Sequence, residues 1–460
     1  MTAANTDNVT FFTTCKPFTG EAAVLQRNAL MTWKKLGLRV IICGPEDGAA
    51  EAAAEFSATH IPDIETNGKG TPLIRSIFAE AEKVCDTPFL AYINADILLT
   101  PPVITATSKA LAGRDSNNPF LMTLRRRNIP LGSPLAGGGA KWLVRLQTLD
   151  RDFGSWDQSN AIDLFLYSRG VFNDIIPLVI GHMQWDNWLL WKARDQGANV
   201  IDASLDAALL HPVHGYGGGN TGLQHRTQGL QAVKNRELAA GNSLDLTAAT
   251  THLLAGGKQI VRDARAKEKL EKACAPDLTK EFWAGIEYLA ENSAERSIGE
   301  MLDCCRTILW RHTRFFPFFE DASTNYDHFL TTVTNARACK KTGNLSKAGD
   351  IIQDLMAGKF LARSQAAQQQ GREIHIWGCG TAGKRVLGLL QRHEIPVSAF
   401  RDSNPAKVGT IIDGVPVVDS NIPEADTEDA PYLLIASMHA SEIASSFEDN
   451  GLQKHQDYTG

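Results

Sequence analysis

Apolar and polar residues follow one another along the first hundred residues in segments that predict strands and helices in turn. Continuous apolar runs at 10–15, 39–43 and 89–97 have the length and composition of buried strands. Helical stretches separate them, from about 21 to 36 and from 71 to about 85. This alternation predicts an α/β fold with a largely parallel sheet, which binds ligands at the carboxyl ends of its strands.

Asp96 lies near the end of the third apolar run, Phe-Leu-Ala-Tyr-Ile-Asn-Ala-Asp-Ile. Its carboxylate is therefore expected at the carboxyl end of a strand. A hard oxygen ligand there can hold Mn²⁺ or Mg²⁺, and such a cation offsets the charge on a departing diphosphate. The alternative is a cap or turn residue.

Several short motifs stand in a fixed order between residues 10 and 216. They are Gln26-Arg27-Asn28-Ala29 with Trp33, Gly70-Thr71-Pro72-Leu73, Tyr92-Ile93-Asn94-Ala95-Asp96-Ile97, Asp163-Leu164-Phe165 with Ser168-Arg169-Gly170, Gly181 with Trp185-Asp186-Asn187-Trp188, and Val200-Ile201-Asp202-Ala203 followed by His211. In this order and spacing the chain resembles GT-A-fold glycosyltransferases and their nucleotide-diphospho-sugar transferase relatives. The resemblance implies a GT-A-like, mixed but mainly parallel sheet.

The resemblance also implies metal and donor ligands. In the GT-A pattern a short acidic motif, usually Asp-x-Asp, binds the metal and the donor diphosphate, and Asn94-Ala95-Asp96 stands in its place. Asn94 offers an amide oxygen to the donor ribose but no charge, so metal affinity depends on Asp96. Similar enzymes place a His after the last strand of the domain. His214 is preferred over His211 because glycines follow it and would let the segment fold over a nucleotide. Two ordinary loop histidines are the alternative.

Further donor contacts are expected around the first strand and in an arginine run. Thr13, Lys16 and Arg27 lie where a GT-A enzyme reads the base and the diphosphate. Arg125, of the run Arg125-Arg126-Arg127, is expected to place a guanidinium on phosphate oxygens. Surface positions and a solvated loop are the alternatives.

Two carboxylates are candidates for proton transfer. Asp186 stands in the first turn of a predicted helix that ends at Gly197, where the helix dipole stabilises an anion. It is the general-base candidate for the acceptor hydroxyl, and Trp185 and Trp188 are expected to stack on sugar faces. The alternative is a cap between two core tryptophans. Asp163, from a strand-like run, is the rival base or an acceptor-binding group.

The carboxy-terminal region carries an independent signal. The turn Gly378-Cys379-Gly380-Thr381-Ala382-Gly383 joins a predicted strand to a helix, and a second strand ends at Asp402. This order predicts a Rossmann-like module at 371–460, with a second nucleotide site at Gly378, Gly380, Gly383 and Asp402. The segment 397–418 resembles small nucleotide-binding modules attached to bacterial sugar-modifying enzymes. The module is too short for a complete dinucleotide fold and shows no hydride-transfer pair, so NAD is not expected. A ligand-free packing or docking domain is the alternative.

Residues 223–370 lack strand alternation and are predicted to be helical. The expected domains are therefore 1–222 (GT-A-like), 223–370 (helical) and 371–460 (small Rossmann-like α/β). Within the middle region, 336–361 resembles one helix-turn-helix unit of the tetratricopeptide sort. Aromatic residues at 310–319 are expected to pack between domains, or to contact a membrane face or a lipid-linked acceptor.

Composition limits the classes of partner. With 43% hydrophobic and 21% charged residues, the 460-residue chain can bury two or three cores. A net charge of −6 without a basic stretch argues against nucleic acid. The eight cysteines show no Cys-x-x-Cys spacing, which indicates a reducing compartment. Without a signal-peptide pattern or a long apolar run, the expected location is the cytoplasm, with peripheral contact at the inner membrane face.

The sequence therefore predicts a nucleotide-sugar-dependent glycosyltransferase that acts on a glycan acceptor, with the substrate class taken from the resemblance to enzymes of bacterial surface polysaccharide synthesis. A sugar nucleotidyltransferase is one alternative, although no Gly-rich triphosphate loop follows the first strand. A non-catalytic nucleotide-binding scaffold is the other, and Asn94 in place of an acid supports it.

Overall fold

The structure is a computed structural model with two compact units, residues 1–292 and 293–460. The described residues are 6–114, 118–135, 138–214, 226–277, 280–281, 283–285, 287–288, 335, 338–339, 342, 347, 358–423, 430–436, 440–454 and 456–459. The predicted helix-turn-helix at 336–361 lies largely outside them, and the aromatic cluster at 310–319 lies wholly outside. No described helix combines the length and the apolar character needed to cross a bilayer.

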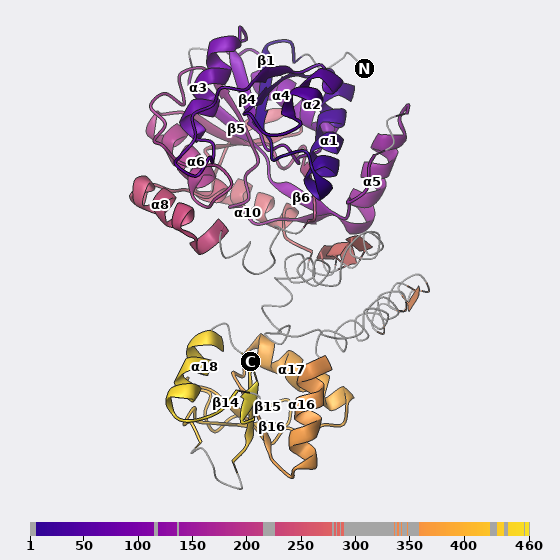
Figure 1. Ribbon diagram of the computed structural model, residues 1–460, viewed down its shortest axis with the longest axis vertical. Helices are drawn as coiled ribbons and strands as arrows, with labels where there is room; N and C mark the ends of the chain where they lie inside the picture. The colour runs from indigo at the N-terminus through magenta and orange to yellow at the C-terminus, as the bar shows by residue number, and fades with distance from the viewer. Residues whose placement is uncertain are drawn as a thin grey trace. The chain divides into compact units, whose positions relative to one another are not determined.

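A nine-stranded, mainly parallel sheet forms the centre of the N-terminal unit, with the order β12-β11-β9-β5-β8-β4-β1-β2-β3 (Figure 1). This mixed α/β architecture confirms the predicted fold class. Within this sheet, β8 is antiparallel to both neighbours and β12 to β11. The strands are β1 (Val9–Thr14), β2 (Arg39–Cys43), β3 (Thr59–Ile61), β4 (Phe89–Ile93), β5 (Phe120–Thr123), β8 (Leu164–Ser168), β9 (Asn199–Asp202), β11 (His252–Ala255) and β12 (Lys258–Val261).

Helices cover both faces of this sheet, because alternate strand residues point to opposite sides. Phe11 packs in the core beneath α1, α2 and α4, and Phe12 packs on the other side with α3 and α6. A smaller sheet, β10-β6-β7, carries part of the candidate site. The further elements are α1 (Gly20–Lys35), α2 (Ala49–Phe56), α3 (Ile74–Val84), α4 (Pro101–Leu111), α5 (Lys141–Phe153), α6 (Trp185–Asp195), β6 (Arg126–Ile129), β7 (Ser155–Trp156) and β10 (Leu209–Pro212).

The region expected to be helical begins differently. Helices α8 (Leu230–Ala239), α9 (Leu246–Ala249) and α10 (Ala264–Ala273) are present, but β11 and β12 form a hairpin between them that extends the large sheet. The first unit therefore continues beyond the expected boundary at 222. Each strand is four residues long, too short to show a period of two. The sequence did mark the turn of this hairpin, with the pair Gly256-Gly257. Both glycines have positive φ, and their backbone amides donate to the Asp206 carboxylate at 2.6 Å.

The C-terminal unit contains a second sheet with the order β15-β16-β14-β13-β17-β18. The chain starts in the middle at β13, moves outward through β14 and β16, and returns to the other side at β17. This is the strand order of a doubly wound fold. The elements are β13 (Ile374–Trp377), β14 (Ala399–Arg401), β15 (Ile411–Ile412), β16 (Val415–Val418), β17 (Tyr432–Ile435), β18 (Tyr458–Thr459), α16 (Gly358–Gln369), α17 (Thr381–Arg392) and α18 (Ala440–Asp449).

Two glycines of α17 should respond in opposite ways to alanine. A Cβ on Gly383 would lie 1.9 Å from the Gly378 carbonyl oxygen, whereas a Cβ on Gly388 meets nothing within 4 Å. Gly383→Ala should destabilise the C-terminal unit by about 2 kcal/mol or more through this clash. Gly388→Ala should stabilise it by about 0.5–1 kcal/mol through helix propensity. Urea unfolding of the full chain measures both, and equal effects would contradict the close approach of helix and strand.

Candidate active site

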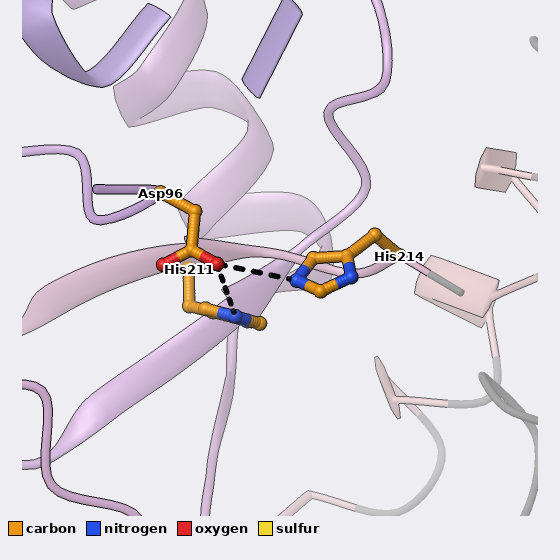
Figure 2. A group of neighbouring side chains, drawn as sticks. All are labelled: Asp96, His211 and His214. Atoms are coloured by element: carbon orange, nitrogen blue, oxygen red, sulfur yellow. Dashed lines mark ion pairs between the residues drawn. The ribbon is translucent and has the colours of Figure 1, made fainter. Parts of the chain in front are cut away.

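Three side chains converge at the carboxyl end of β4. Asp96 lies three residues beyond the strand, His211 lies on β10, and His214 follows two residues after β10. The Asp96 Oδ2 atom is 3.4 Å from His214 Nε2 and 3.9 Å from His211 Nε2. Figure 2 marks these two contacts and shows both imidazole rings beside the Asp96 carboxylate. One donor atom from each residue lies within 4.8 Å of the other two. The structure thus brings both candidate histidines to Asp96.

Protonation in this cluster suits cation binding. Burial alone would raise the pKa of Asp96, but the hydrogen bond from His214 and the positive charge of Lys16 hold that pKa well below its usual range. Burial, with Arg126 nearby, keeps the pKa of His211 well below 6.5. A carboxylate and a neutral imidazole are the ligand forms that a metal requires. The residues present therefore fit a divalent cation.

A second carboxylate, Asp163, lies beside this cluster. Because β8 runs antiparallel to β4, the residue before β8 meets the residue after β4, and Asn94 Nδ2 donates to Asp163 Oδ1 at 2.7 Å. Arg126 donates to Asp163 Oδ2 at 3.1 Å. Burial raises the pKa of Asp163, and the charge of Asp96 adds to this, while Arg126 and Asn94 oppose it. The Asn94 amide oxygen accepts from the Tyr92 hydroxyl at 2.9 Å, so both ends of this amide are engaged within the protein.

Arg126, rather than Arg125, is the arginine directed toward the cluster. Arg125 is buried and contacts Glu271 at 2.8 Å, Thr247 at 3.1 Å and Asp202 at 3.7 Å. Adjacent residues of an extended segment point to opposite sides, so only one of the pair can face the site. The structure does not bring Arg125 to the Asp96 cluster, which corrects the expected diphosphate contact.

Asp186 occupies the first turn of α6, as expected, and accepts from the Asn187 amide at 2.9 Å. Burial raises its pKa to about 6, the hydrogen bond from Asn187 opposes that rise, and the charge of Asp163 adds to it. The neighbouring indoles differ from expectation. Trp185 and Trp188 are 5% and 3% exposed, and both belong to the core beneath the sheet. Their ring faces are covered by protein, which corrects the expected stacking on sugars.

The three residues expected to contact the donor near β1 have different surroundings. Thr13 is fully buried, and its hydroxyl donates to the Thr14 carbonyl. Arg27 is half-buried and pairs with Glu55. Lys16 is exposed and lies close enough for its charge to lower the pKa of Asp96. Of these three side chains, only Lys16 acts electrostatically on the cluster.

Sequence reasoning missed Glu46, in the turn after β2. Its Oε2 atom and the Thr14 hydroxyl are buried and have no hydrogen-bond partner. Both face Gly44, since a Cβ there would lie 2.1 Å from Glu46 Oε2 and 3.3 Å from Thr14 Oγ1. Gly44 has a φ of 119°, a conformation that favours glycine. In the sequence, Gly44-Pro45-Glu46 has the composition of an ordinary turn after a strand, which gives no sign of a binding role. Buried polar atoms without partners are costly, so they indicate a place where a ligand can supply a donor.

Comparison with known proteins adds only distant likenesses. No family model and no curated protein matches the chain. Among solved structures, it is similar to glucosyl-3-phosphoglycerate synthase from Mycobacterium tuberculosis in complex with Mg²⁺ and uridine-diphosphate, with 14% identity, a TM-score of 0.28, and coverage of 44% of this chain and 70% of that one. It is also similar to S. aureus TarS 1-349 in complex with UDP-GlcNAc, with 11% identity, a TM-score of 0.30 and coverage of 76% and 92%.

A third similar structure is the inositol-1-phosphate CTP transferase from T. maritima, with 12% identity, a TM-score of 0.28 and coverage of 44% and 88%. All three TM-scores are below 0.5, so these likenesses carry no argument. The functional assignment therefore depends on the residues of this chain.

In the C-terminal unit, the Asp402 carboxylate contacts the glycine turn at Cys379, and both of its oxygens accept hydrogen bonds. Asp402 Oδ2 accepts from the Cys379 thiol at 2.8 Å, from Lys407 Nζ at 3.1 Å and from the Cys379 amide at 3.2 Å, and Oδ1 accepts from the Asn404 amide. Burial raises the pKa of Asp402, but these hydrogen bonds outweigh it and hold the pKa at about 2. A ribose at this acid would therefore compete with Lys407.

Proposed function

We propose that the N-terminal unit transfers a sugar from a nucleotide-diphosphate donor to a glycan acceptor. The observation that supports this most directly is the grouping of Asp96, His211 and His214 at the carboxyl end of a mainly parallel sheet, beside a second carboxylate, Asp163, whose pKa is raised. When bound there, a divalent cation would supply positive charge against the leaving diphosphate.

The ligand set favours Mn²⁺ over Mg²⁺. Two of the three donor groups are imidazoles, and Mg²⁺ prefers oxygen ligands and retains its waters. Mn²⁺ accepts carboxylate ligands and is less averse than Mg²⁺ to nitrogen. Lys16 adds a fixed positive charge near Asp96, in keeping with an anionic ligand at this end of the sheet.

Asp186 is the candidate general base. A pKa of about 6 leaves its carboxylate largely ionised at neutral pH and still basic enough to take a proton from a hydroxyl as that hydroxyl attacks. This role applies if the reaction inverts the anomeric centre, and with retention Asp186 would position a substrate instead. Asp163 is the weaker candidate, because Arg126 and Asn94 engage both of its oxygens.

Glu46 and Thr14 are candidates for recognition of the donor base. An ionised carboxylate only accepts hydrogen bonds, so Glu46 Oε2 would pair with an N–H group of the base. Each common base presents such a donor, as a ring N–H in uracil and guanine or as an amino group in adenine, cytosine and guanine. A panel of nucleotide sugars therefore identifies the base.

The acceptor and the second nucleotide site remain proposals from the sequence resemblance. The acceptor would be a glycan of a bacterial surface polysaccharide, modified at the cytoplasmic face. Gly378, Gly380, Gly383 and Asp402 would bind a second nucleotide if Lys407 moves away from Asp402.

A thermal-shift panel of nucleotide sugars, with and without Mn²⁺, tests the donor site. The wild type should respond to the nucleotide sugar of one base, and only with the metal present. Glu46→Gln should weaken that response about tenfold, because one buried acceptor is lost. Glu51→Gln, at an exposed position of α2, is the matched control.

Other outcomes of this panel identify the alternatives. A donor response that Glu46→Gln leaves unchanged would contradict the role of Glu46. Pyrophosphate release from a nucleoside triphosphate would indicate a nucleotidyltransferase. The scaffold would be favoured if no ligand gave a response and Asp96→Ala were indistinguishable from the wild type in every assay. A thermal shift lost only in Asp402→Ala would place nucleotide binding in the C-terminal unit.

A further inference from the structure

A buried polar chain leads away from His211 on the side opposite Asp96. His211 and Asn128 are register partners on the parallel strands β10 and β6, and His211 Nδ1 lies 3.1 Å from Asn128 Oδ1. Asn128 Nδ2 donates to Asp157 Oδ2 at 3.1 Å. All three residues are less than 10% exposed. None of these contacts was expected from the sequence, since Asn128 and Asp157 belong to no motif.

Asp157 determines which way the Asn128 amide points. Arg126 pairs with Asp157 Oδ2 at 2.8 Å, and this ion pair keeps the carboxylate ionised. An ionised carboxylate accepts hydrogen bonds and cannot donate them. The Asn128 group that faces Asp157 must therefore be the NH₂ group, which leaves the amide oxygen to face His211.

The amide orientation in turn fixes the imidazole. Because the Asn128 oxygen is an acceptor, His211 Nδ1 must carry the proton. In the neutral ring the lone pair then lies on Nε2, the atom that faces Asp96. A histidine that binds a metal through one nitrogen requires this arrangement, with the other nitrogen donating to a neighbouring group.

We infer that Asn128 and Asp157 are positioning residues that hold His211 as its Nδ1–H tautomer, with Nε2 ready for a divalent cation. The role of this tautomer in metal binding rests on the proposed function. The tautomer itself is a property of the metal-free chain. Neither residue is among the groups proposed to contact the donor or the acceptor.

The histidine nitrogens can be observed directly. Metal-free, full-length protein labelled with ¹⁵N-histidine gives long-range ¹H–¹⁵N spectra that distinguish the two tautomers, and His211→Gln identifies the His211 signals. The wild type should show Nδ1–H at His211. Asn128→Leu should lose this preference and bind Mn²⁺ alone about 10- to 100-fold more weakly, measured from free Mn²⁺ by electron paramagnetic resonance.

Two further variants separate the steps of the chain. Asp157→Asn leaves the Asn128 amide free to turn over, so a mixture of tautomers and a several-fold weaker Mn²⁺ affinity are expected. Asn199→Leu, on β9 at an exposed position, makes the same change of residue away from the chain and should change neither the tautomer nor the affinity.

The outcomes are distinct from those of the donor panel. If the spectrum of the wild type shows the proton of His211 on Nε2, the inference is overturned, even if Asn128→Leu fails to fold. Metal-dependent donor binding is decided separately by the donor panel. An unchanged tautomer and unchanged Mn²⁺ affinity in folded Asn128→Leu also overturn it. Failure of the wild type to bind Mn²⁺ overturns the cation site of the proposed function, and the tautomer result still decides the role of Asn128.

Discussion

Replacing Asp96 with alanine is expected to abolish Mn²⁺-dependent donor binding and to lower the transfer rate about a thousandfold. Asp96 is the carboxylate of the cluster, and the two imidazoles provide no negative charge. The cation would lose its main electrostatic attraction to the site. The leaving diphosphate would then lose several kcal/mol of stabilisation, which corresponds to a thousandfold lower rate. Calorimetric titration with Mn²⁺ and donor, together with initial rates, measures both effects.

Two further variants separate charge from packing. Asp96→Asn preserves the shape of the side chain, so it should lose nearly as much binding and activity as alanine. Asp195→Ala removes an exposed carboxylate at the end of α6 and should behave like the wild type. If Asp96→Asn bound Mn²⁺ and turned over at the wild-type rate, the cation site would have to lie elsewhere.

The second large effect is expected for Asp186→Asn, which should lower kcat about 10²- to 10⁴-fold through loss of the general base. In the wild type the rate should rise with pH and level off above about 6, as Asp186 loses its proton. The amide cannot titrate, so this acidic limb should disappear from the residual rate. A pH profile of kcat for both proteins measures the change, and an unaltered limb would assign the titration to another group.

The same substitution should stabilise the fold in a defined pH range. Folding raises the pKa of Asp186 from 3.8 to about 6, so between these values the folded chain retains a proton that the unfolded chain has released. The free energy of unfolding therefore falls as the pH rises through this range, and the penalty is complete above it. Asp186→Asn should add up to about 3 kcal/mol at pH 8 and nothing near pH 4. Equal destabilisation at both pH values would instead indicate a purely structural role.

Much of the site could be expected from the sequence because strand periodicity places residues along the chain. The apolar run before Asp96 identifies a strand end, and the His211–His214 spacing places two imidazoles after another strand. The side to which a residue points is harder to predict. Arg125 and Arg126 are adjacent and chemically identical, and only the pairing of β6 with β10 decides which of them faces Asp163.

Long-range packing accounts for the remaining differences. Trp185 and Trp188 flank Asp186, so the sequence allowed both a sugar-stacking role and a core role, and the aromatic side chains of Tyr92 and Phe165 place Trp185 in the core. Glu46 gave no signal because its relevance depends on a buried oxygen without a partner, a property of the folded chain alone. Such features become visible only when strands distant in sequence are neighbours.

The antiparallel insertion of β8 between β4 and β5 has a consequence for how the candidate site assembles during folding. Asn94 and Asp163 meet only after β8 has paired with β4, and Asp96 meets His211 across more than a hundred residues of chain. Contacts this distant in sequence form late, because closing long loops costs entropy before any contact is made. Mn²⁺-dependent donor binding should therefore recover in the slowest refolding phase of the N-terminal unit, after most helical signal has returned, and would report on completion of the sheet.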